Sequence, residues 1–394
     1  RDQHGGGRSA AATGGARGMN AGLCGRRLGK RLSSRTWKTW TGPLHTHGRA
    51  WKTSRGISMA GCSATNGKAK LLVIANEDRP ELRLLSDLPG SVEVVKVGLD
   101  FSDVSDEALA SVDAVLVGAG PTGARAESIK TVFPKLSSVR WIHSNMAGLD
   151  FFMFPELKES TGITVTNSKG VYSSSLAEYA LFAAKYFALN TPRLLRQKAD
   201  STWEKFPVEE LRGKTLGVIG YGDIGRATGT LAKAFGMEVL ASRRNPDLSK
   251  GDPVVSEMFA VTDLEAMVSR CDYVVVSTPL VAGTKHIVNE KVLAAMKPTA
   301  VVINIGRGPC IDEAALTRAL KSGQIKGAAL DVFEVEPLAE ASELWGMDNV
   351  FISPHNADQV EGWLHNSIRL FLENMGNYLN EKELKNIVSL QRGY

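Results

Sequence analysis

Three charged side chains that can carry out acid–base chemistry each follow a predicted strand in the second half of the chain. Arg307 follows VVINIG, Glu336 follows ALDVFEV, and His355 follows VFISP. An arginine holds a carboxylate through two parallel hydrogen bonds, and histidine exchanges a proton near neutral pH. A carboxylate beside an imidazole keeps that ring protonated. Together these residues predict an anionic substrate that Arg307 holds and His355 protonates.

Each of these residues, taken alone, has a simpler structural explanation. Arg307 could be an ion-pair partner, Glu336 an acid that starts a helix before Pro337, and His355 a hydrogen-bonded loop residue. Their joint placement favours a site, because ligands of open α/β sheets bind at the carboxyl ends of the strands. The segment that carries Glu336 also brings Asp331 to this edge.

A glycine motif lies between a predicted strand and a predicted helix. The segment LGVIGYGDIG places Gly220, Gly222 and Gly225 in G-x-G-x-x-G spacing. The first glycine of this motif makes a tight turn, the second admits a pyrophosphate, and the third lets the helix pack on the strand. A helix that begins near Asp223 and Ile224 offers its N–H groups to phosphate. This context predicts a dinucleotide site rather than an ordinary glycine-rich turn.

Two adjacent arginines predict which dinucleotide binds. The next apolar run, MEVLAS, is followed by Arg243 and Arg244. An acid near this position usually binds the ribose hydroxyls of NAD, whereas an arginine accommodates the 2′-phosphate of NADP. The alternative is a pair of solvated loop arginines. We therefore expect NADP(H) to be preferred, and NAD(H) remains open as a second cofactor.

A dinucleotide beside Arg307, Glu336 and His355 matches what the reduction of a 2-keto acid requires. The arginine grips the carboxylate and polarises the ketone, while the histidine protonates the ketone oxygen as hydride arrives. The reaction needs no metal ion, and the four cysteines lack the C-x-x-C spacing of a zinc site. The expected partner is a small 2-keto or 2-hydroxy acid.

The alternation of strands and helices from residue 70 onward predicts an α/β fold. Runs rich in β-branched residues predict the strands KLLVIAN, VEVVKVG, DAVLVGAG, VRWIHSN and GITVTN. Helices are expected between them in PELRLLSDL, SDEALASV and AESIKTVFPKL. We expect these elements to form a flavodoxin-like substrate domain with a parallel sheet over residues 70–170.

A second Rossmann-like domain, doubly wound around the dinucleotide site, is expected over residues 171–358. Its later strands are predicted in CDYVVVSTPL, AVVINIGRG, KGAALDVFEVEPL and NVFISPH. One long helix, SLAEYALFAAKYFALNTPRLLRQK, lies between the first unit and the dinucleotide site, and its nearly all-apolar first half predicts burial at a domain or subunit interface. The amphipathic segment EGWLHNSIRLFLENMGNYLN predicts a helix that returns to the first domain, which residues 359–394 complete.

The formal net charge of +5 misrepresents the body of the chain. Residues 1–69 hold 13 of the 47 basic residues and one of the 42 acidic residues, which leaves 34 basic and 41 acidic residues. A mildly acidic body gives no support for nucleic-acid binding. No later stretch is long and apolar enough to predict a membrane span.

The first 69 residues have the composition of an organelle transit peptide, rich in Arg, Ser, Gly and Ala and nearly free of acids. We expect a disordered leader and import into an organelle, with the mitochondrion favoured over the plastid. Met19 is a candidate first residue. Translation from Met59 would instead give a cytoplasmic protein.

The chain resembles the D-isomer-specific 2-hydroxyacid dehydrogenases over about residues 70–394. The resemblance rests on GVIGYGDIG, STPLVAGTKHIVNEKVLAAMKPTAVVINIGRG, GAALDVFEVEPL, SPH and WIHSNMAGLD. It implies that Arg307 orients the substrate, Glu336 is the partner acid and His355 donates the proton. It also implies that the backbone amides of Ala147 and Gly148 receive the substrate carboxylate.

The same resemblance implies a cofactor site and an assembly. Asp331 would hold the nicotinamide carboxamide. With the motif residues above, the expected cofactor-binding set is Gly220, Gly222, Asp223, Ile224, Gly225, Arg243, Arg244, Thr278, Pro279, Ile305 and Asp331. Such enzymes are homodimers through the cofactor domain, which fits the run from Glu178 to Asn190, and their interdomain cleft closes on binding.

The chain departs from the family pattern directly after the histidine. The segment HNADQ, with Asn356, Ala357 and Asp358, replaces a small, glycine-containing run and puts the contacts at the nicotinamide end in question. His143 and His286 are expected to be structural.

The resemblance leaves the substrate and the class of protein to be decided. The NADP preference resembles the glyoxylate and hydroxypyruvate reductases, whereas phosphoglycerate dehydrogenases commonly carry a C-terminal regulatory domain that we do not expect in a chain ending at Tyr394. Two other classes remain open. One is a corepressor-like, dinucleotide-sensing binding protein of the same fold, and the other is a cofactor-binding scaffold without catalysis.

Overall fold

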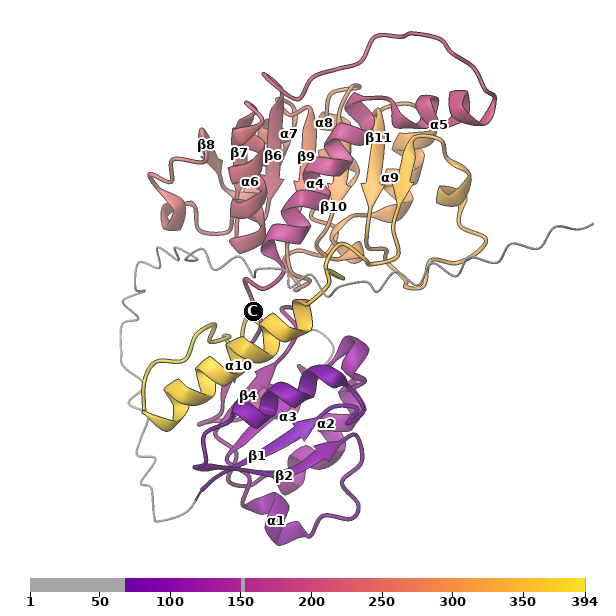
Figure 1. Cartoon of the computed structure of the whole chain (residues 1–394). Coiled ribbons are helices and arrows are strands. Elements are labelled where there is room, and N and C mark those ends of the chain that lie inside the picture. Colours follow the sequence, from indigo (N-terminus) through magenta and orange to yellow (C-terminus); the bar gives the residue numbers. More distant parts are fainter. Residues whose placement is uncertain (1–67, 150–152, 394) are drawn as a thin grey trace, which may run out of the picture. The chain divides into compact units, whose positions relative to one another are not determined.

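Two parallel β-sheets organise the computed structural model, which describes residues 68–149 and 153–393 (Figure 1). The central strands of both sheets are buried along their whole length. Burial on both faces is characteristic of parallel sheets that helices cover. The leader expected over residues 1–69 lies almost entirely outside the described residues.

The first sheet has the strand order β2-β1-β3-β4-β5, and every neighbouring pair is parallel. Its strands are β1 (Ala69–Ile74), β2 (Val92–Gly98), β3 (Ala114–Val117), β4 (Trp141–Ser144) and β5 (Thr164–Thr166). The connecting α-helices are α1 (Asp106–Ala110), α2 (Ala126–Val132) and α3 (Pro155–Glu159). This order is that of flavodoxin-like sheets, which confirms the expected fold of the first domain.

Two of the predicted helices in this part are wrong in detail. The segment PELRLLSDL forms a 3₁₀ helix over Pro80–Asp87 rather than an α-helix. Side chains three residues apart are eclipsed in a 3₁₀ helix, and Leu82 and Leu85 both pack against the core. The helix expected through residue 136 ends at Val132, because Pro134 cannot donate a backbone hydrogen bond and a 3₁₀ turn takes over.

The C-terminal helix α10 (Trp363–Leu379) packs on the first sheet. The ring of Trp141 on β4 stacks on Phe371 and on Tyr378, with 5.3 Å between ring centroids in each pair. Through these contacts the amphipathic helix packs against β4 of the first sheet.

The second sheet has the strand order β12-β11-β10-β9-β6-β7-β8, again fully parallel. Its strands are β6 (Thr215–Ile219), β7 (Glu238–Ser242), β8 (Glu257–Phe259), β9 (Tyr273–Val276), β10 (Val301–Asn304), β11 (Gly327–Leu330) and β12 (Val350–Ile352). The helices are α6 (Asp223–Ala234), α7 (Leu264–Val268), α8 (Glu290–Ala295) and α9 (Glu313–Lys321). The strand order reverses between β6 and β9, so the sheet is doubly wound as expected. Sheets of this kind bind their ligands beside such a point.

The long helix expected before the second sheet is two helices, α4 (Ser173–Ala188) and α5 (Thr191–Ala199). Between them Asn190 has a φ of 49°, in the left-handed region, and Pro192 lies at the start of α5. The prediction of one helix was wrong because proline is tolerated in a first turn but breaks a helix interior. Across residues 68–149 and 153–393, no helix combines the length and apolar character needed to cross a membrane.

Candidate active site

The glycine motif forms the turn between β6 and α6, and each glycine meets different surroundings. Gly220 has a φ of +96°, and a Cβ there would lie 2.9 Å from the backbone nitrogen of Thr278. A Cβ on Gly225 would lie 2.7 Å from the carbonyl oxygen of Gly220. A Cβ on Gly222 would meet no heavy atom within 4 Å. Packing therefore requires the first and third glycines, and the second faces open space where a pyrophosphate fits.

The N-terminus of α6 lies directly behind this open space. Gly222 is its N-cap, and no side chain among the described residues caps the helix. The first-turn N–H groups of Asp223, Ile224 and Gly225 and the positive end of the helix dipole suit an anion. The Asp223 carboxylate accepts a hydrogen bond from the Ser173 hydroxyl at the start of α4, which ties this acid to a neighbouring helix.

Two buried hydroxyls near the same strand ends have no hydrogen-bond partner among the described residues. They are Oγ1 of Thr278, just beyond β9, and Oγ of Ser242 at the end of β7. Buried hydroxyls are normally paired, so a polar ligand at this edge would complete their bonding. Pro279 comes directly after Thr278, and Ile305 directly after β10 is buried. The open position at Gly222 and the unpaired Thr278 hydroxyl fit a dinucleotide.

Arg243 is the first residue after β7, as the sequence predicts. It is half-buried, and its Nη1 donates a hydrogen bond to Oγ of Ser249 over 2.5 Å. Arg244 is exposed. The Ser249 hydroxyl therefore restrains the first arginine. Ser249 is a neighbour that sequence reasoning missed, because it lies in a 3₁₀ turn six residues further on.

His355 and Glu336 meet at the ends of β11 and β12. The Nδ1 atom of His355 lies 2.8 Å from Oε2 of Glu336, while Oε1 of Glu336 accepts the N–H of Phe333 over 3.0 Å. The Glu336 hydrogen bond raises the pKa of His355 above its ordinary 6.5, against the effect of burial. Burial pushes the pKa of Glu336 upward, but the hydrogen bonds from His355 and Phe333 hold it below 4.5. The pair therefore favours a protonated imidazole beside a carboxylate.

Asp331 is buried under the loop that carries His355, with 1% of its surface exposed. Its Oδ1 accepts hydrogen bonds from the Ser353 hydroxyl and from the N–H groups of Asn356 and Ala357. Oδ2 accepts the N–H of Ala357 over 3.1 Å. The unusual segment after the histidine is thus anchored through backbone N–H groups, which do not depend on its side chains. The resemblance assigns Asp331 to the nicotinamide, whereas its contacts here are to this loop.

Arg307 follows β10, and its Nη1 donates to the Gly306 carbonyl over 2.9 Å. A Cβ on the next residue, Gly308, would lie 1.8 Å from backbone atoms of Phe333. This close approach packs the Arg307 loop against the segment that leads to Glu336. The positive charge of Arg307 also lowers the pKa of His355, though less than Glu336 raises it.

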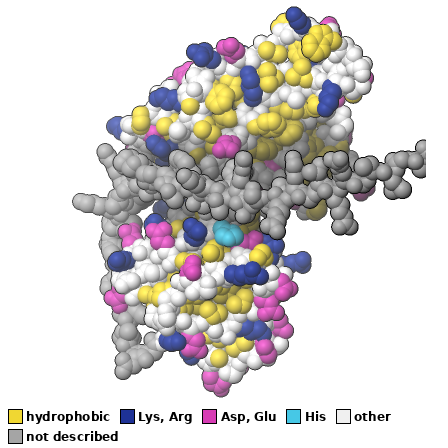
Figure 2. Space-filling model, viewed as in Figure 1, with side chains coloured by type: hydrophobic (Ala, Val, Ile, Leu, Met, Phe, Trp, Pro, Cys, Tyr) yellow, Lys and Arg dark blue, Asp and Glu magenta, His cyan; other side chains and the backbone are white. Residues whose placement is uncertain are grey.

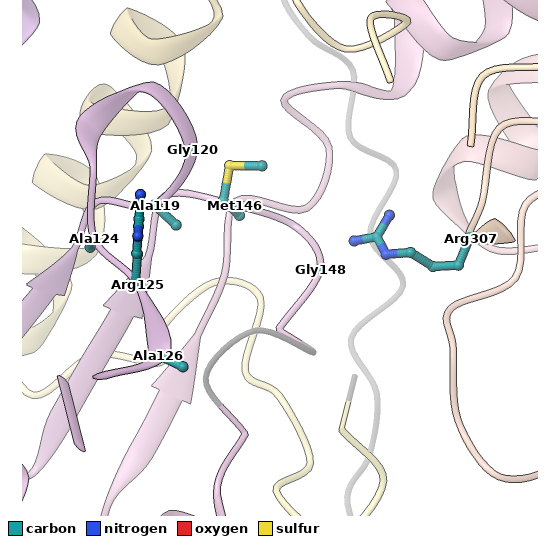
Figure 3. A pocket seen from close by; sticks show the side chains of 8 residues that line it. All are labelled: Ala119, Gly120, Ala124, Arg125, Ala126, Met146, Gly148 and Arg307. Atoms are coloured by element: carbon teal, nitrogen blue, oxygen red, sulfur yellow. The ribbon is translucent and has the colours of Figure 1, made fainter. Parts of the chain in front are cut away.

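A cavity of about 320 Å³ brings Arg307 together with one predicted substrate residue, Gly148 (Figure 3). Its other lining residues are Ala119, Gly120, Ala124, Arg125, Ala126 and Met146. Ala147 is not part of the lining, and its carbonyl accepts a hydrogen bond from Nδ2 of Asn167 over 2.7 Å. The sequence did not single out Arg125, which precedes α2.

The two histidines expected to be structural each have a side-chain partner of their own. His143 on β4 is fully buried, its Nδ1 lies 2.7 Å from Oγ1 of Thr166, and burial lowers its pKa to about 3. Nε2 of His286 lies 2.7 Å from Oε1 of Glu334. In the described part of the chain, no three His, Cys, Asp or Glu side chains cluster as metal ligands would.

Comparison with known proteins places this geometry in a family. Residues 184–357 match the NAD binding domain of the D-isomer specific 2-hydroxyacid dehydrogenases. A glyoxylate reductase of Pyrococcus horikoshii is 37% identical over 57% of this chain and 69% of its own length. A D-3-phosphoglycerate dehydrogenase of Methanocaldococcus jannaschii is 31% identical over 82% of this chain, which spans 59% of that protein.

A solved structure agrees with the sequence comparisons. The D-isomer specific 2-hydroxyacid dehydrogenase from Xanthobacter autotrophicus Py2, in complex with NADPH and MES, is 28% identical with a TM-score of 0.69. The match covers 83% of this chain and 100% of that one. With the Rossmann-like sheet and the glycine turn, these matches show that the chain belongs to the D-isomer specific 2-hydroxyacid dehydrogenase family.

Proposed function

We propose that the protein reduces a small 2-keto acid of the glyoxylate or hydroxypyruvate kind to the D-2-hydroxy acid, with NADPH as the preferred reductant. The contact between His355 and Glu336 at the carboxyl edge of the dinucleotide-binding sheet carries this proposal. The bound nicotinamide would supply the hydride. The glyoxylate reductase similarity supports the substrate class.

His355 supplies the proton through the nitrogen that Glu336 leaves available. Glu336 holds Nδ1, so Nε2 of the protonated imidazole is the donor. The His355 side chain is 39% exposed, which lets solvent return the proton after each turnover. The raised pKa of His355 keeps the acid form populated near neutral pH.

Arg307 and the loop at Ala147 and Gly148 hold the substrate carboxylate. The bond from Asn167 to the Ala147 carbonyl restrains this loop, and the resemblance assigns the backbone amides of Ala147 and Gly148 to the substrate carboxylate. The guanidinium of Arg307 lines the same cavity as Gly148 and polarises the ketone.

Arg243 determines the preference for NADPH. It stands directly after β7, where an acid would favour the free ribose hydroxyls of NAD, and Ser249 restrains its guanidinium. A restrained guanidinium loses less freedom when it binds a 2′-phosphate.

Arg125 favours a second class of substrate, a 2-keto acid with two anionic groups. It is a second cation beside Arg307 in the lining of the cavity. Arg125 is exposed, and among the described residues its guanidinium has no ion-pair partner. A 2-keto acid with a second anionic group would satisfy it. The similarity to a D-3-phosphoglycerate dehydrogenase points to phosphorylated substrates of this kind.

Initial rates distinguish these candidates. Wild type and Arg125→Ala are assayed with glyoxylate, hydroxypyruvate and 3-phosphohydroxypyruvate, each with NADPH and with NADH. Our proposal predicts that the two small acids turn over and that Arg125→Ala leaves their KM unchanged. A preference for the phosphorylated acid that Arg125→Ala abolishes would establish the second class. Tight dinucleotide binding with no turnover of any acid would instead favour the corepressor-like alternative.

The proposed assembly is a homodimer through the cofactor domain. Hydrophobic side chains gather over α4 and α5 (Figure 2). The exposed ones in and just after these helices are Phe182, Leu194, Leu195 and Trp203. An exposed apolar patch of this kind marks an interface. Import into an organelle stays a prediction, since the leader lies outside the described residues.

A further inference from the structure

A chain of short hydrogen bonds runs from α4 to the loop that carries His355. The hydroxyl of Tyr179 lies 2.6 Å from Oγ of Ser353, which lies 2.6 Å from Oδ1 of Asp331. A carboxylate only accepts, so the single Ser353 proton is donated to Asp331. Tyr179 must then donate to Ser353, which fixes the direction of the whole chain.

Asp331 holds three successive backbone N–H groups of the loop. Its carbonyl oxygen accepts the N–H of His355 over 2.8 Å, and its carboxylate accepts those of Asn356 and Ala357. Asp331 is buried, and hydrogen bonds to a charged acceptor in a buried setting are strong. One residue, Asp331, therefore holds the backbone of His355 through its carbonyl and that of the next two residues through its carboxylate.

The backbone of His355 needs such support. Its φ of +51° lies in the left-handed region, which residues with a Cβ seldom adopt unless their surroundings impose it. The contact of 2.8 Å between His355 and Glu336 is made from this conformation. Any loosening of the loop would lengthen that contact.

We infer that Tyr179 is a positioning residue for His355, acting through Ser353 and Asp331. The inference rests on the proposed function, in which His355 donates the proton. Without the Tyr179 proton, Oγ of Ser353 loses its donor and the hydroxyl is free to turn away from Asp331. The carboxylate would then hold the loop with one bond fewer.

Two variants remove single links in this chain. Tyr179→Phe deletes only the tyrosine hydroxyl, and Ser353→Ala deletes the middle link. Tyr273→Phe is the matched control, because Tyr273 is a buried tyrosine at the amino end of β9, away from the ligand edge of the sheet. The double variant of Tyr179 and Ser353 should lose no more than the worse single variant, since both break one chain.

The measurements are kcat, KM and the pH dependence of 2-keto acid reduction, with the imidazole pKa of His355 followed by NMR. Tyr179→Phe should lower kcat about tenfold, the equivalent of one hydrogen bond, with the KM for NADPH unchanged. The pKa of His355 should fall toward its ordinary 6.5 as the contact with Glu336 loosens. A Tyr179→Phe variant with wild-type kcat and wild-type His355 pKa overturns the inference, as does an equal change in Tyr273→Phe.

The NMR titration separates this inference from the proposed function. If wild type reduces no 2-keto acid, the proposed function fails while the His355 signal, assigned by its loss in His355→Gln, still reports on the loop. In that case, a fall of the His355 pKa in Tyr179→Phe but not in Tyr273→Phe supports the positioning role. An unchanged pKa overturns it.

Discussion

The imidazole of His355 and the carboxylate of Glu336 lie 2.8 Å apart although 19 positions separate them in the chain. Strands β11 and β12 pair in parallel, and Leu330 lies opposite Ile352 at their ends. Glu336 and His355 follow shortly after these two ends, so the pairing creates the contact. The register of the sheet therefore brings the imidazole of His355 to the carboxylate of Glu336.

Glu336→Gln should move the pH dependence of reduction. In wild type the Glu336 hydrogen bond raises the pKa of His355, so reduction weakens only as pH rises through that raised value. Without the carboxylate charge this loss should begin at lower pH, closer to 6.5. Rate profiles for the two proteins test the shift, and superimposable profiles would show that the pair does not set the acid.

The same pair should stabilise the fold within a defined pH window. The pKa of Glu336 is lowered, so its contribution is present above 4.5 and lost as pH falls through the lowered value. The pKa of His355 is raised, so its contribution is complete below 6.5 and lost as pH rises through the raised value. Thermal unfolding of wild type and Glu336→Gln should therefore differ most between these two pH values.

Alanine at two of the glycines should separate folding from cofactor binding. Gly222→Ala meets no neighbouring atom, so the thermal midpoint should stay near wild type while NADPH affinity falls. Gly225→Ala places a Cβ 2.7 Å from the Gly220 carbonyl, so the midpoint itself should fall. Thermal unfolding and NADPH titration measure both effects. Unaltered NADPH affinity in Gly222→Ala would place the pyrophosphate elsewhere.

Arg243→Asp should swing the preference from NADPH toward NADH. The acid repels a 2′-phosphate and accepts hydrogen bonds from free ribose hydroxyls. Arg244→Asp changes the same charge at an exposed neighbour and should have the smaller effect. The ratio of kcat/KM for the two cofactors measures the change. If the wild type prefers NADH, Arg243 and Arg244 do not bind a 2′-phosphate, and the alternative of two solvated loop arginines holds.

Phe182→Glu should convert a dimer into monomers. Phe182 is 54% exposed on α4, and a glutamate in its place would bury a charge in the proposed interface. Leu99→Glu is the control, because Leu99 is 41% exposed beside the first sheet. Light scattering gives the mass of each protein in solution. A monomeric wild type would rule out the assembly.

Local patterns predicted the elements of this fold well. The glycine turn, the strands and the position of Arg243 follow from short apolar runs and fixed spacings. The break at Asn190 was missed because the apolar periodicity continues past it, although Pro192 signals a new helix. The 3₁₀ helix over Pro80–Asp87 was missed because its leucines also suit an α-helix.

Contacts between distant elements could not be predicted in this way. The chain from Tyr179 through Ser353 to Asp331 joins α4 to two strand ends, and no spacing in the sequence indicates it. Nor did any spacing in the sequence indicate that His286, expected to be structural, also pairs with a glutamate, Glu334. His286 with Glu334 and His355 with Glu336 have the same chemistry and nearly the same separation.

These two pairs provide the most direct test of the central claim. NADPH oxidation with hydroxypyruvate is measured for wild type, His355→Gln and His286→Gln, with the chirality of the product determined. We predict D-glycerate, a loss of kcat of about 10²–10⁴-fold in His355→Gln with NADPH affinity retained, and wild-type kcat in His286→Gln. A His355→Gln variant that turns over like wild type would contradict the assignment of His355 as the proton donor.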